Sequence, residues 1–108
     1  MMRIIKEKTL TDYCKLSKYK EAKNSVSAWI YEVRFSVWNN AGELKAKYKN
    51  ASIINSKRVI FNTKGNEYRL IVDIEYKLSI VFIVWFGTHE EYNCIDVKRV
   101  SYKTGMNP

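Results

Sequence analysis

The chain has 108 residues and a formal net charge of +8, from 19 lysines and arginines against 11 aspartates and glutamates. A hydrophobic fraction of 46% supports a packed core, which excludes a wholly disordered chain, and the length predicts one domain over residues 1–108. The longest apolar run, Leu78–Gly87, is about half the ~20 residues of a membrane-spanning helix. Met1–Lys6 has no apolar core of a signal peptide, so we expect a soluble cytoplasmic protein without a membrane partner.

The sequence lacks the usual signatures of several enzyme classes. It contains no HExxH, CxxC or Walker-type glycine loop, so zinc proteolysis, thiol redox chemistry and nucleoside triphosphate hydrolysis are excluded. Its two cysteines are too few for a disulfide scaffold and are not spaced as metal ligands. We expect no metal and no cofactor, and we expect Cys14 to be a small core residue.

The basic charge is concentrated in one window. Residues 44–66 contain no acidic residue and six basic ones, namely Lys45, Lys47, Lys49, Lys57, Arg58 and Lys64. This pattern is typical of a surface that binds a polyanion, with RNA or DNA as the default ligand. It is equally typical of a solvated lysine-rich surface, so charge alone does not decide between the two.

Hydrophobic spacing predicts helices in the first half of the chain, after a short strand at Met2–Ile5. Thr9, with Asp12 in the following turn, is typical of a helix N-cap. A second helix is predicted by one apolar stripe, formed by Ala22, Val26, Trp29, Ile30, Val33 and Val37.

A third, short helix is predicted over Ala41–Tyr48. Asn40 with Glu43 three residues later resembles a capping box, in which each residue satisfies a backbone amide of the other. On this helix the three lysines Lys45, Lys47 and Lys49 would face water or a ligand.

The second half of the chain alternates as strands do. Three strands are predicted, over Arg58–Lys64, Glu67–Tyr76 and Ser79–Phe86, with a tight turn at Lys64–Asn66. Helices followed by an antiparallel meander predict an α+β domain, with the N-terminal helices on one face of a mostly antiparallel sheet of about four strands. The other face would be partly open and would display Arg58, Asn62, Lys64 and Arg69 together.

His89, the only histidine, follows the apolar strand directly. Imidazole exchanges protons near neutral pH, and nearby lysine, arginine and tyrosine would suit attack of an RNA 2′-hydroxyl on its own phosphate. A structural or surface role for His89 is as compatible with this position as a catalytic role. Tyr92, Tyr68 and Tyr76 are able to stack on bases, although packing is the expected role of at least two of them.

Two ordered blocks of the sequence are RVIFNTKGNEYRLIV at residues 58–72 and GTHEEY at residues 87–92. In these blocks the chain resembles the HigB toxins of bacterial type II toxin–antitoxin modules. The start at Met2–Ile5 and the helix around Ala28 and Trp29 fit the same family, so the resemblance extends to about Asp96.

This resemblance implies a RelE-like α+β fold and an mRNA interferase, which in many members cuts messenger RNA on the translating ribosome. It also implies a cognate HigA antitoxin, a helix-turn-helix protein that represses the shared operon. By the same resemblance, the phosphate-contacting and transition-state-stabilising roles fall on Arg58, Lys64 and Arg69.

The remaining site residues follow from the same blocks. The resemblance implies that His89 transfers a proton, that Tyr92 stacks on a base or assists that transfer, and that Asn62 hydrogen-bonds the RNA. Asn93 stands where the family commonly has aspartate, with Glu91 or Asp96 as possible substitutes for an acidic role.

The leading hypothesis is a metal-independent endoribonuclease that leaves a 2′,3′-cyclic phosphate. A second is a non-catalytic RNA- or ribosome-binding module that inhibits translation by occupancy and does not need His89. A third is a ParE-like poison of DNA gyrase with a related fold, against which the Thr88–His89 block argues by resemblance only.

Overall fold

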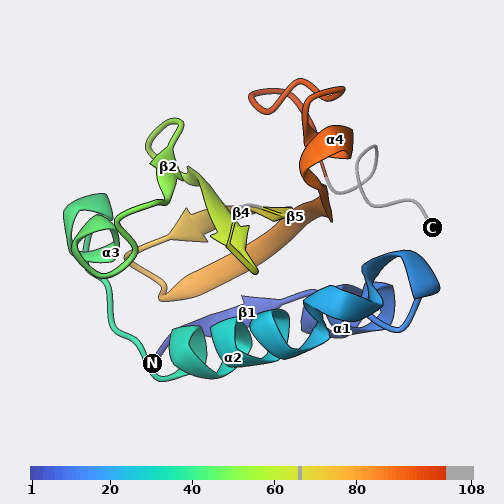
Figure 1. Ribbon diagram of the computed structural model, residues 1–108. Helices are drawn as coiled ribbons and strands as arrows, with labels where there is room; N and C mark the ends of the chain where they lie inside the picture. Colours follow the sequence, from blue (N-terminus) through green and yellow to red (C-terminus); the bar gives the residue numbers. More distant parts are fainter. Residues whose placement is uncertain (66, 102–108) are drawn as a thin grey trace.

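A five-stranded sheet organises the chain (Figure 1). The computed structural model describes residues 1–65 and 67–101, so the predicted turn residue Asn66 lies outside the described part. The strand order is β1-β5-β4-β3-β2, and all neighbours are antiparallel except β1 and β5. The elements are β1 (Arg3–Ile5), α1 (Glu7–Tyr13), the 3-10 helix η1 (Ser17–Ala22), α2 (Lys23–Arg34), α3 (Ala41–Lys47), β2 (Ser52–Ile53), β3 (Arg58–Thr63), β4 (Tyr68–Glu75), β5 (Ile80–Thr88) and α4 (His89–Tyr92).

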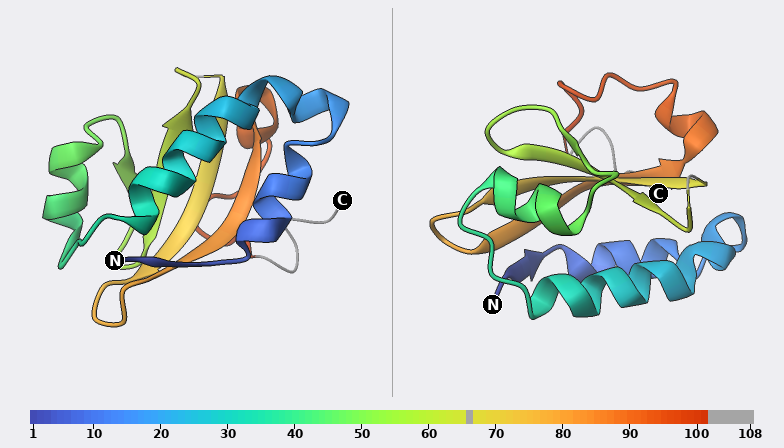
Figure 2. Two further views of the ribbon diagram at one scale, coloured as in Figure 1. Left: turned by 90° about the horizontal axis from the view of Figure 1, so that it is seen from below. Right: turned by 60° about the vertical axis from the view of Figure 1, so that its left-hand side comes forward.

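The two faces of the sheet are covered by different parts of the chain. Helices α1 and α2 pack under one face, whereas α4 and the segment 93–101 lie over the other (Figures 1 and 2). Helix α3 lies at one edge, beside β2 and β3. The predicted α+β class, with the N-terminal helices on one face of a mostly antiparallel sheet, is therefore confirmed.

No helix in the described part of the chain has the length and apolar character needed to cross a bilayer.

The apolar stripe of α2 forms the centre of the core, as predicted. Val26 and Val33 are buried, and the Trp29 ring meets Phe61 of β3 edge-on, with 5.3 Å between ring centroids. The stripe does not reach Val37, which is exposed because the helix ends at Arg34.

The N-cap predicted at Thr9 is wrong. Helix α1 begins at Glu7, and its N-cap is Lys6, which has a left-handed φ of 72° and makes no side-chain cap. The chain must reverse from β1 directly into the helix, and this tight reversal sets the start. Asp12 consequently lies in the last turn, where its carboxylate pairs with Lys8 at 2.9 Å.

The third helix was predicted correctly from a local signal. The Asn40 side chain accepts a hydrogen bond from the Glu43 amide at 3.0 Å, and Leu44 is buried. The Glu43 carboxylate accepts from the Asn39 amide rather than from Asn40, so only half of the capping box forms.

The three predicted strands are present, and the sheet has one strand more than expected. Strand β2 pairs Ser52 and Ile53 with Ile60 and Val59. Two residues are too short to show a period, so the sequence pattern carried no signal for this strand.

A β-bulge interrupts the pairing of β4 with β5. Ile71 lies opposite Trp85 and Val72 lies opposite Ile83, so Val84 is an extra residue with no partner. A bulge shifts the alternation of side chains beyond it by one. As a result Trp85 and Gly87 lie on the same face as Arg69, the face that carries α4.

Arg58 holds the segment 93–101 on the sheet. Its guanidinium pairs with both carboxylate oxygens of Asp73, at 2.8 and 2.9 Å, and donates to the carbonyl oxygens of Val97 (3.2 Å) and Val100 (2.6 Å). Arg58 is only 8% exposed. Because its donors satisfy backbone and carboxylate acceptors together, this side chain acts as a clamp.

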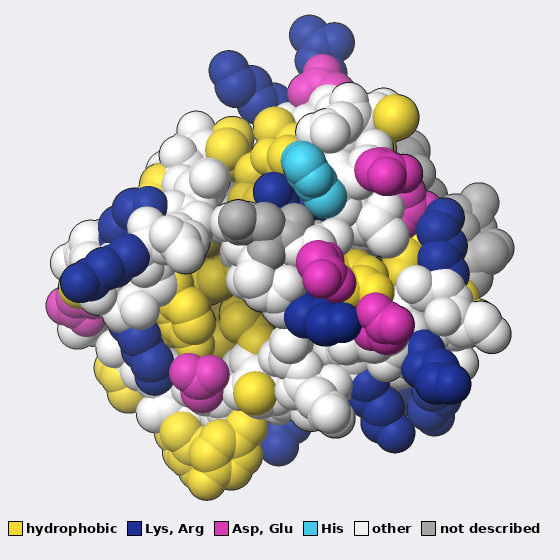
Figure 3. Space-filling view, viewed as in Figure 1, with side chains coloured by type: hydrophobic (Ala, Val, Ile, Leu, Met, Phe, Trp, Pro, Cys, Tyr) yellow, Lys and Arg dark blue, Asp and Glu magenta, His cyan; other side chains and the backbone are white. Residues whose placement is uncertain are grey.

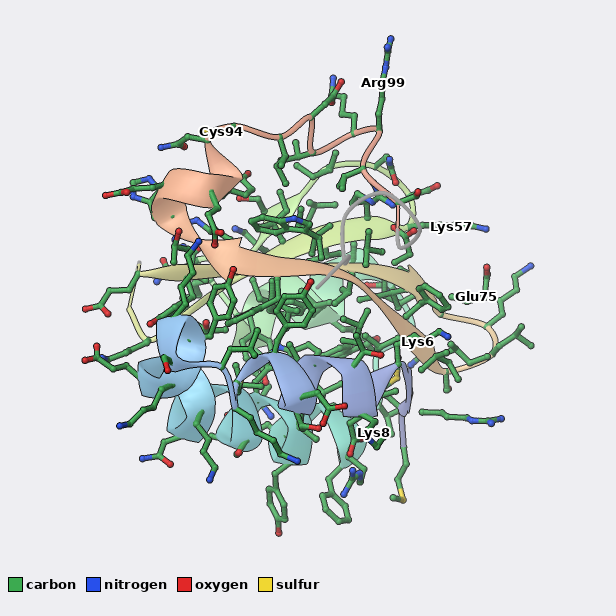
Figure 4. The ribbon with its side chains drawn as sticks, turned by 90° about the vertical axis from the view of Figure 1, so that its right-hand side faces the viewer. Lys6, Lys8, Lys57, Glu75, Cys94 and Arg99 are labelled. Atoms are coloured by element: carbon green, nitrogen blue, oxygen red, sulfur yellow. The ribbon has the colours of Figure 1, made fainter. Side chains whose placement is uncertain are left out.

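We expect Arg58→Ala to lower the free energy of unfolding by about 2–4 kcal/mol, since it leaves Asp73 and two carbonyls without their donor. Urea unfolding at pH 7 measures this. Arg99→Ala is the matched control, because the Arg99 side chain is 88% exposed and extends away from the body of the protein (Figure 4). A loss no larger than that of the control would contradict the clamp.

Candidate functional site

Three neighbouring strands bring Asn62, Arg69 and Gly87 into one row. Asn62 lies directly opposite Arg69, and Arg69 lies directly opposite Gly87. Directly opposed residues of antiparallel strands project to the same face, about 5 Å apart. The row therefore places an amide and a guanidinium side by side beneath α4.

Arg69 is oriented by an aromatic ring. Its guanidinium carbon lies 5.6 Å from the centroid of the Tyr92 ring, and its Nη1 donates to the Tyr68 carbonyl at 3.3 Å. The Tyr92 ring in turn lies 6.4 Å from the Trp85 ring. A cation held over an aromatic face in a half-buried position loses less freedom when it binds an anion.

Gly87 provides the space for this aromatic contact. A Cβ atom at this position would lie 2.5 Å from the Trp85 ring and 2.9 Å from Glu91 Oε1. The Trp85 ring is packed and the Glu91 carboxylate is hydrogen-bonded, so moving either group aside would cost free energy. Only glycine lets the Trp85 ring and α4 approach the strand this closely.

Helix α4 begins with a complete capping box. The Thr88 hydroxyl accepts from the Glu91 amide at 3.2 Å, and the Glu91 carboxylate accepts from the Thr88 amide at 2.9 Å. The His89 amide donates to the carbonyl of Glu67, the residue before β4, at 2.9 Å, which fixes the start of the helix to the beginning of that strand. The box therefore places His89 at the first position and Tyr92 at the last.

The His89 side chain is exposed at a surface pocket of about 550 Å³. In the space-filling view the histidine (cyan) lies above the sheet, with basic and acidic side chains around it (Figure 3). The pocket residues are Lys18, Glu67, Thr88, His89, Glu90 and Glu91.

Glu91 connects α4 to η1. Its carboxylate accepts hydrogen bonds from the Tyr19 hydroxyl at 2.9 Å and from Lys18 Nζ at 2.6 Å. Burial alone would raise the pKa of Glu91, but the bonds from Lys18, the Thr88 amide and Tyr19 outweigh it and lower that pKa. Burial and the neighbouring carboxylate raise the pKa of Tyr19, which keeps its hydroxyl a donor.

The lysines of the predicted third helix do not behave alike. Lys47 and Lys49 line a second pocket together with Asn62, so these three predicted RNA-binding residues lie together. Lys45 instead donates through Nζ to the carbonyl oxygens of Lys49 and Ala51. Lys45 therefore holds the loop that carries the other two.

Two predicted site residues are not displayed on the open face as expected. Arg58 is on the expected face, but it is buried by the segment 93–101 and bound as described above. Lys64 lies beyond the end of β3 at a left-handed φ of 46°, so the strand alternation does not extend to it. Its Nζ pairs with Glu21 of η1 at 3.0 Å and with Glu67 at 3.4 Å.

The other tyrosines and the cysteines have packing or surface positions. Tyr68 is buried and stacks on Phe86 at 5.7 Å, and Tyr76 is half-buried. Cys14 is buried as predicted, and burial raises the pKa of its thiol to about 11. Cys94 is exposed just after α4 (Figure 4).

Sequence reasoning did not identify the parts that orient the site. The anchoring of Glu91 to η1 and the Trp85–Gly87 contact depend on tertiary contacts. One signal was readable, since Thr88 and Glu91 have the spacing of a capping box before they are seen in space.

We expect Glu91→Gln to lower the free energy of unfolding by about 1–3 kcal/mol at pH 7. The folded-state pKa is depressed, so this contribution is complete above the reference pKa of 4.5 and is lost as pH falls through the lower folded value. Urea unfolding at pH 7 and pH 3 should therefore show a difference from wild type that shrinks at pH 3. Glu90→Gln, at the exposed neighbouring position, is the control, and an equal difference at both pH values would contradict this role.

Comparison with known proteins identifies the family. The model of the HigB toxin family, described as the RelE-like toxic component of a toxin–antitoxin system, matches residues 22–95. The match includes both sequence blocks and every residue of the row and of α4, while β1 and α1 lie outside it. A search of curated proteins returned no match. The chain belongs to the HigB toxin family and is the toxin of a toxin–antitoxin system, with an antitoxin as its partner.

Proposed function

We propose that this toxin is an mRNA interferase, a metal-independent endoribonuclease that acts on messenger RNA, in association with the ribosome, and thereby inhibits translation. One observation carries the proposal. The Arg69 guanidinium lies over the Tyr92 ring and opposite Asn62, and the four-residue helix that ends with Tyr92 begins with His89. A cation, an amide, a phenol and an imidazole are thus held within one small region. Membership of a RelE-like family supports the same function.

The proposed reaction uses the RNA's own 2′-hydroxyl as the nucleophile. A base takes the proton of this hydroxyl, the oxygen attacks the adjacent phosphorus, and the bond to the 5′-oxygen breaks. The leaving oxygen takes a proton, so the products are a 2′,3′-cyclic phosphate and a 5′-hydroxyl end. We assign a proton-transfer step to His89, and charge stabilisation on the phosphoryl oxygens to Arg69.

Tyr92 and Asn62 have supporting roles in this proposal. The Tyr92 ring orients Arg69 and is available to stack on a base or to assist proton transfer, and Asn62 hydrogen-bonds the RNA. Lys64 contributes to the local charge while its Nζ is paired with Glu21. Arg58 supports the site indirectly, by clamping the segment 93–101. Because Arg58 is buried, we assign direct contact with the phosphate to the other cations.

We further propose that the antitoxin is a HigA-like helix-turn-helix protein. Membership of the family implies that the partner is an antitoxin. The resemblance to HigB toxins adds the expectation that this antitoxin is a helix-turn-helix protein. Sequencing the gene beside that of the toxin tests this directly. A neighbouring product without a helix-turn-helix pattern would contradict it.

We expect His89→Ala to reduce the cleavage rate about 10²–10⁴-fold and Arg69→Ala about 10²–10³-fold. Each variant should relieve the growth arrest caused by expression of the toxin while keeping the thermal unfolding midpoint near that of wild type. The matched control is Arg99→Ala, which should stay toxic because the Arg99 side chain extends away from the body of the protein (Figure 4).

Primer extension on mRNA from induced cells separates cleavage from occupancy. Wild-type toxin should generate new 5′ ends, and both variants should not. Growth arrest without new 5′ ends would contradict an endoribonuclease and favour a toxin that blocks translation by binding. Unchanged toxicity in both variants would contradict the assigned catalytic residues.

We expect Lys47→Ala and Lys49→Ala to weaken RNA binding and reduce its salt dependence. Each lost phosphate contact should lower the slope of log K against log salt by about 0.7 for a single strand. Fluorescence anisotropy from 50 to 300 mM KCl measures the slope, with Lys23→Ala on α2 as control. A slope equal to that of wild type would exclude these lysines from phosphate contact.

A further inference from the structure

A second pocket, distinct from the His89 pocket, lies between the end of α3 and β3. Its volume is about 340 Å³, and its lining includes Lys47, Tyr48, Lys49, Asn50, Phe61 and Asn62. Figure 3 shows hydrophobic side chains exposed on the α3 side of the sheet, with basic side chains beside them. This volume is at the lower end of the range for small-molecule sites, about 300–1,000 Å³, and suits one planar group better than an extended chain.

The pocket is built before any ligand arrives. Lys45 Nζ bonds the carbonyl oxygens of Lys49 and Ala51, and the Ala51 amide donates to the Tyr48 carbonyl at 3.0 Å. The loop 48–51 is therefore fixed by hydrogen bonds at both ends. Because this wall is preformed, binding a ligand does not require the free energy of ordering the loop.

One side of the pocket is aromatic. The Tyr48 ring packs edge-on against Phe61 at 5.1 Å and against Trp38 at 5.9 Å, so its position is set by the core. Lys47 Nζ lies 5.8 Å from the centroid of the same ring. A ring with a cation beside it is a surface on which nucleobases stack.

The rest of the lining offers hydrogen bonds and positive charge. Asn50 and Asn62 each carry an amide, which presents a donor and an acceptor together and matches the edge of a base. Lys47 and Lys49 supply positive charge for a phosphate.

The pocket adjoins the row of the candidate site. Asn62 lines the pocket and lies directly opposite Arg69, so the two sites share a wall. A nucleotide whose phosphate is bound at Arg69 would have a neighbouring base within reach of Asn62. This continuity points to the same polymer in both places.

We propose that this pocket binds the base of an unpaired nucleotide next to the phosphate held at Arg69. The proposal rests on the proposed function, because it places the pocket on the path of the same RNA strand. The pocket thus selects the sequence context of cleavage, whereas Arg69 and His89 act on the phosphodiester.

The test compares oligonucleotides that have equal phosphates but differ in bases. Fluorescein-labelled deoxyhexamers of dA, dC and dT, and an abasic hexamer, cannot be cleaved because they lack the 2′-hydroxyl. We expect wild-type protein to bind at least one base-bearing hexamer about tenfold more tightly than the abasic one. The ratio of the two affinities, base-bearing over abasic hexamer, should fall about threefold in Asn50→Ala and in Asn62→Ala. It should not change in Asn24→Ala, on the exposed side of α2.

A second measurement does not depend on variants that fold. The side-chain amide NMR signals of Asn50 and Asn62 should shift on addition of the dA, dC or dT hexamer that binds most tightly, and not on addition of the abasic hexamer. An unchanged ratio in both variants, or equal shifts with both hexamers, would overturn the base site while leaving cleavage of RNA intact. Failure of every hexamer to bind would instead contradict the proposed function.

Discussion

The charged carboxylate of Glu91 is the contact on which the candidate site depends. It accepts hydrogen bonds from the Thr88 amide, the Tyr19 hydroxyl and the Lys18 ammonium. A helix of four residues cannot hold its shape through its own hydrogen bonds, because helix formation has a costly nucleus. The order of α4 therefore depends on contacts with the rest of the chain, and this carboxylate, together with the bond from the His89 amide to the Glu67 carbonyl, holds His89 and Tyr92 in place.

The bulge at Val84 has a comparable effect on the sheet side of the site. Without the bulge, regular alternation from Phe82 onward would place Val84 and Phe86 on the face that carries α4. With it, Trp85 and Gly87 lie there, and the absence of a side chain at Gly87 lets Trp85 approach α4. A single inserted residue thus converts an apolar strand into one wall of a polar site.

Local signals predicted most of the fold, and tertiary contacts decided the rest. The Asn40 cap, the α2 stripe and the alternation of β3 and β4 involve neighbours in sequence, so they could be read directly. The bulge, the parallel pairing of β1 with β5 and the burial of Arg58 require segments that are far apart in the chain. The same distinction holds for the site. The alternation correctly placed Asn62 and Arg69 together, but it could not show that Lys64 turns away at the strand end.

The clamp at Arg58 has a consequence for where the folded unit ends. The family match stops at residue 95, yet the carbonyl oxygens that Arg58 binds belong to Val97 and Val100. Side chains of Ile95, Val97 and Val100 also pack against the core. The packed structure therefore extends at least five residues beyond the end of the family match, and a buried guanidinium rather than a strand or helix holds this extension.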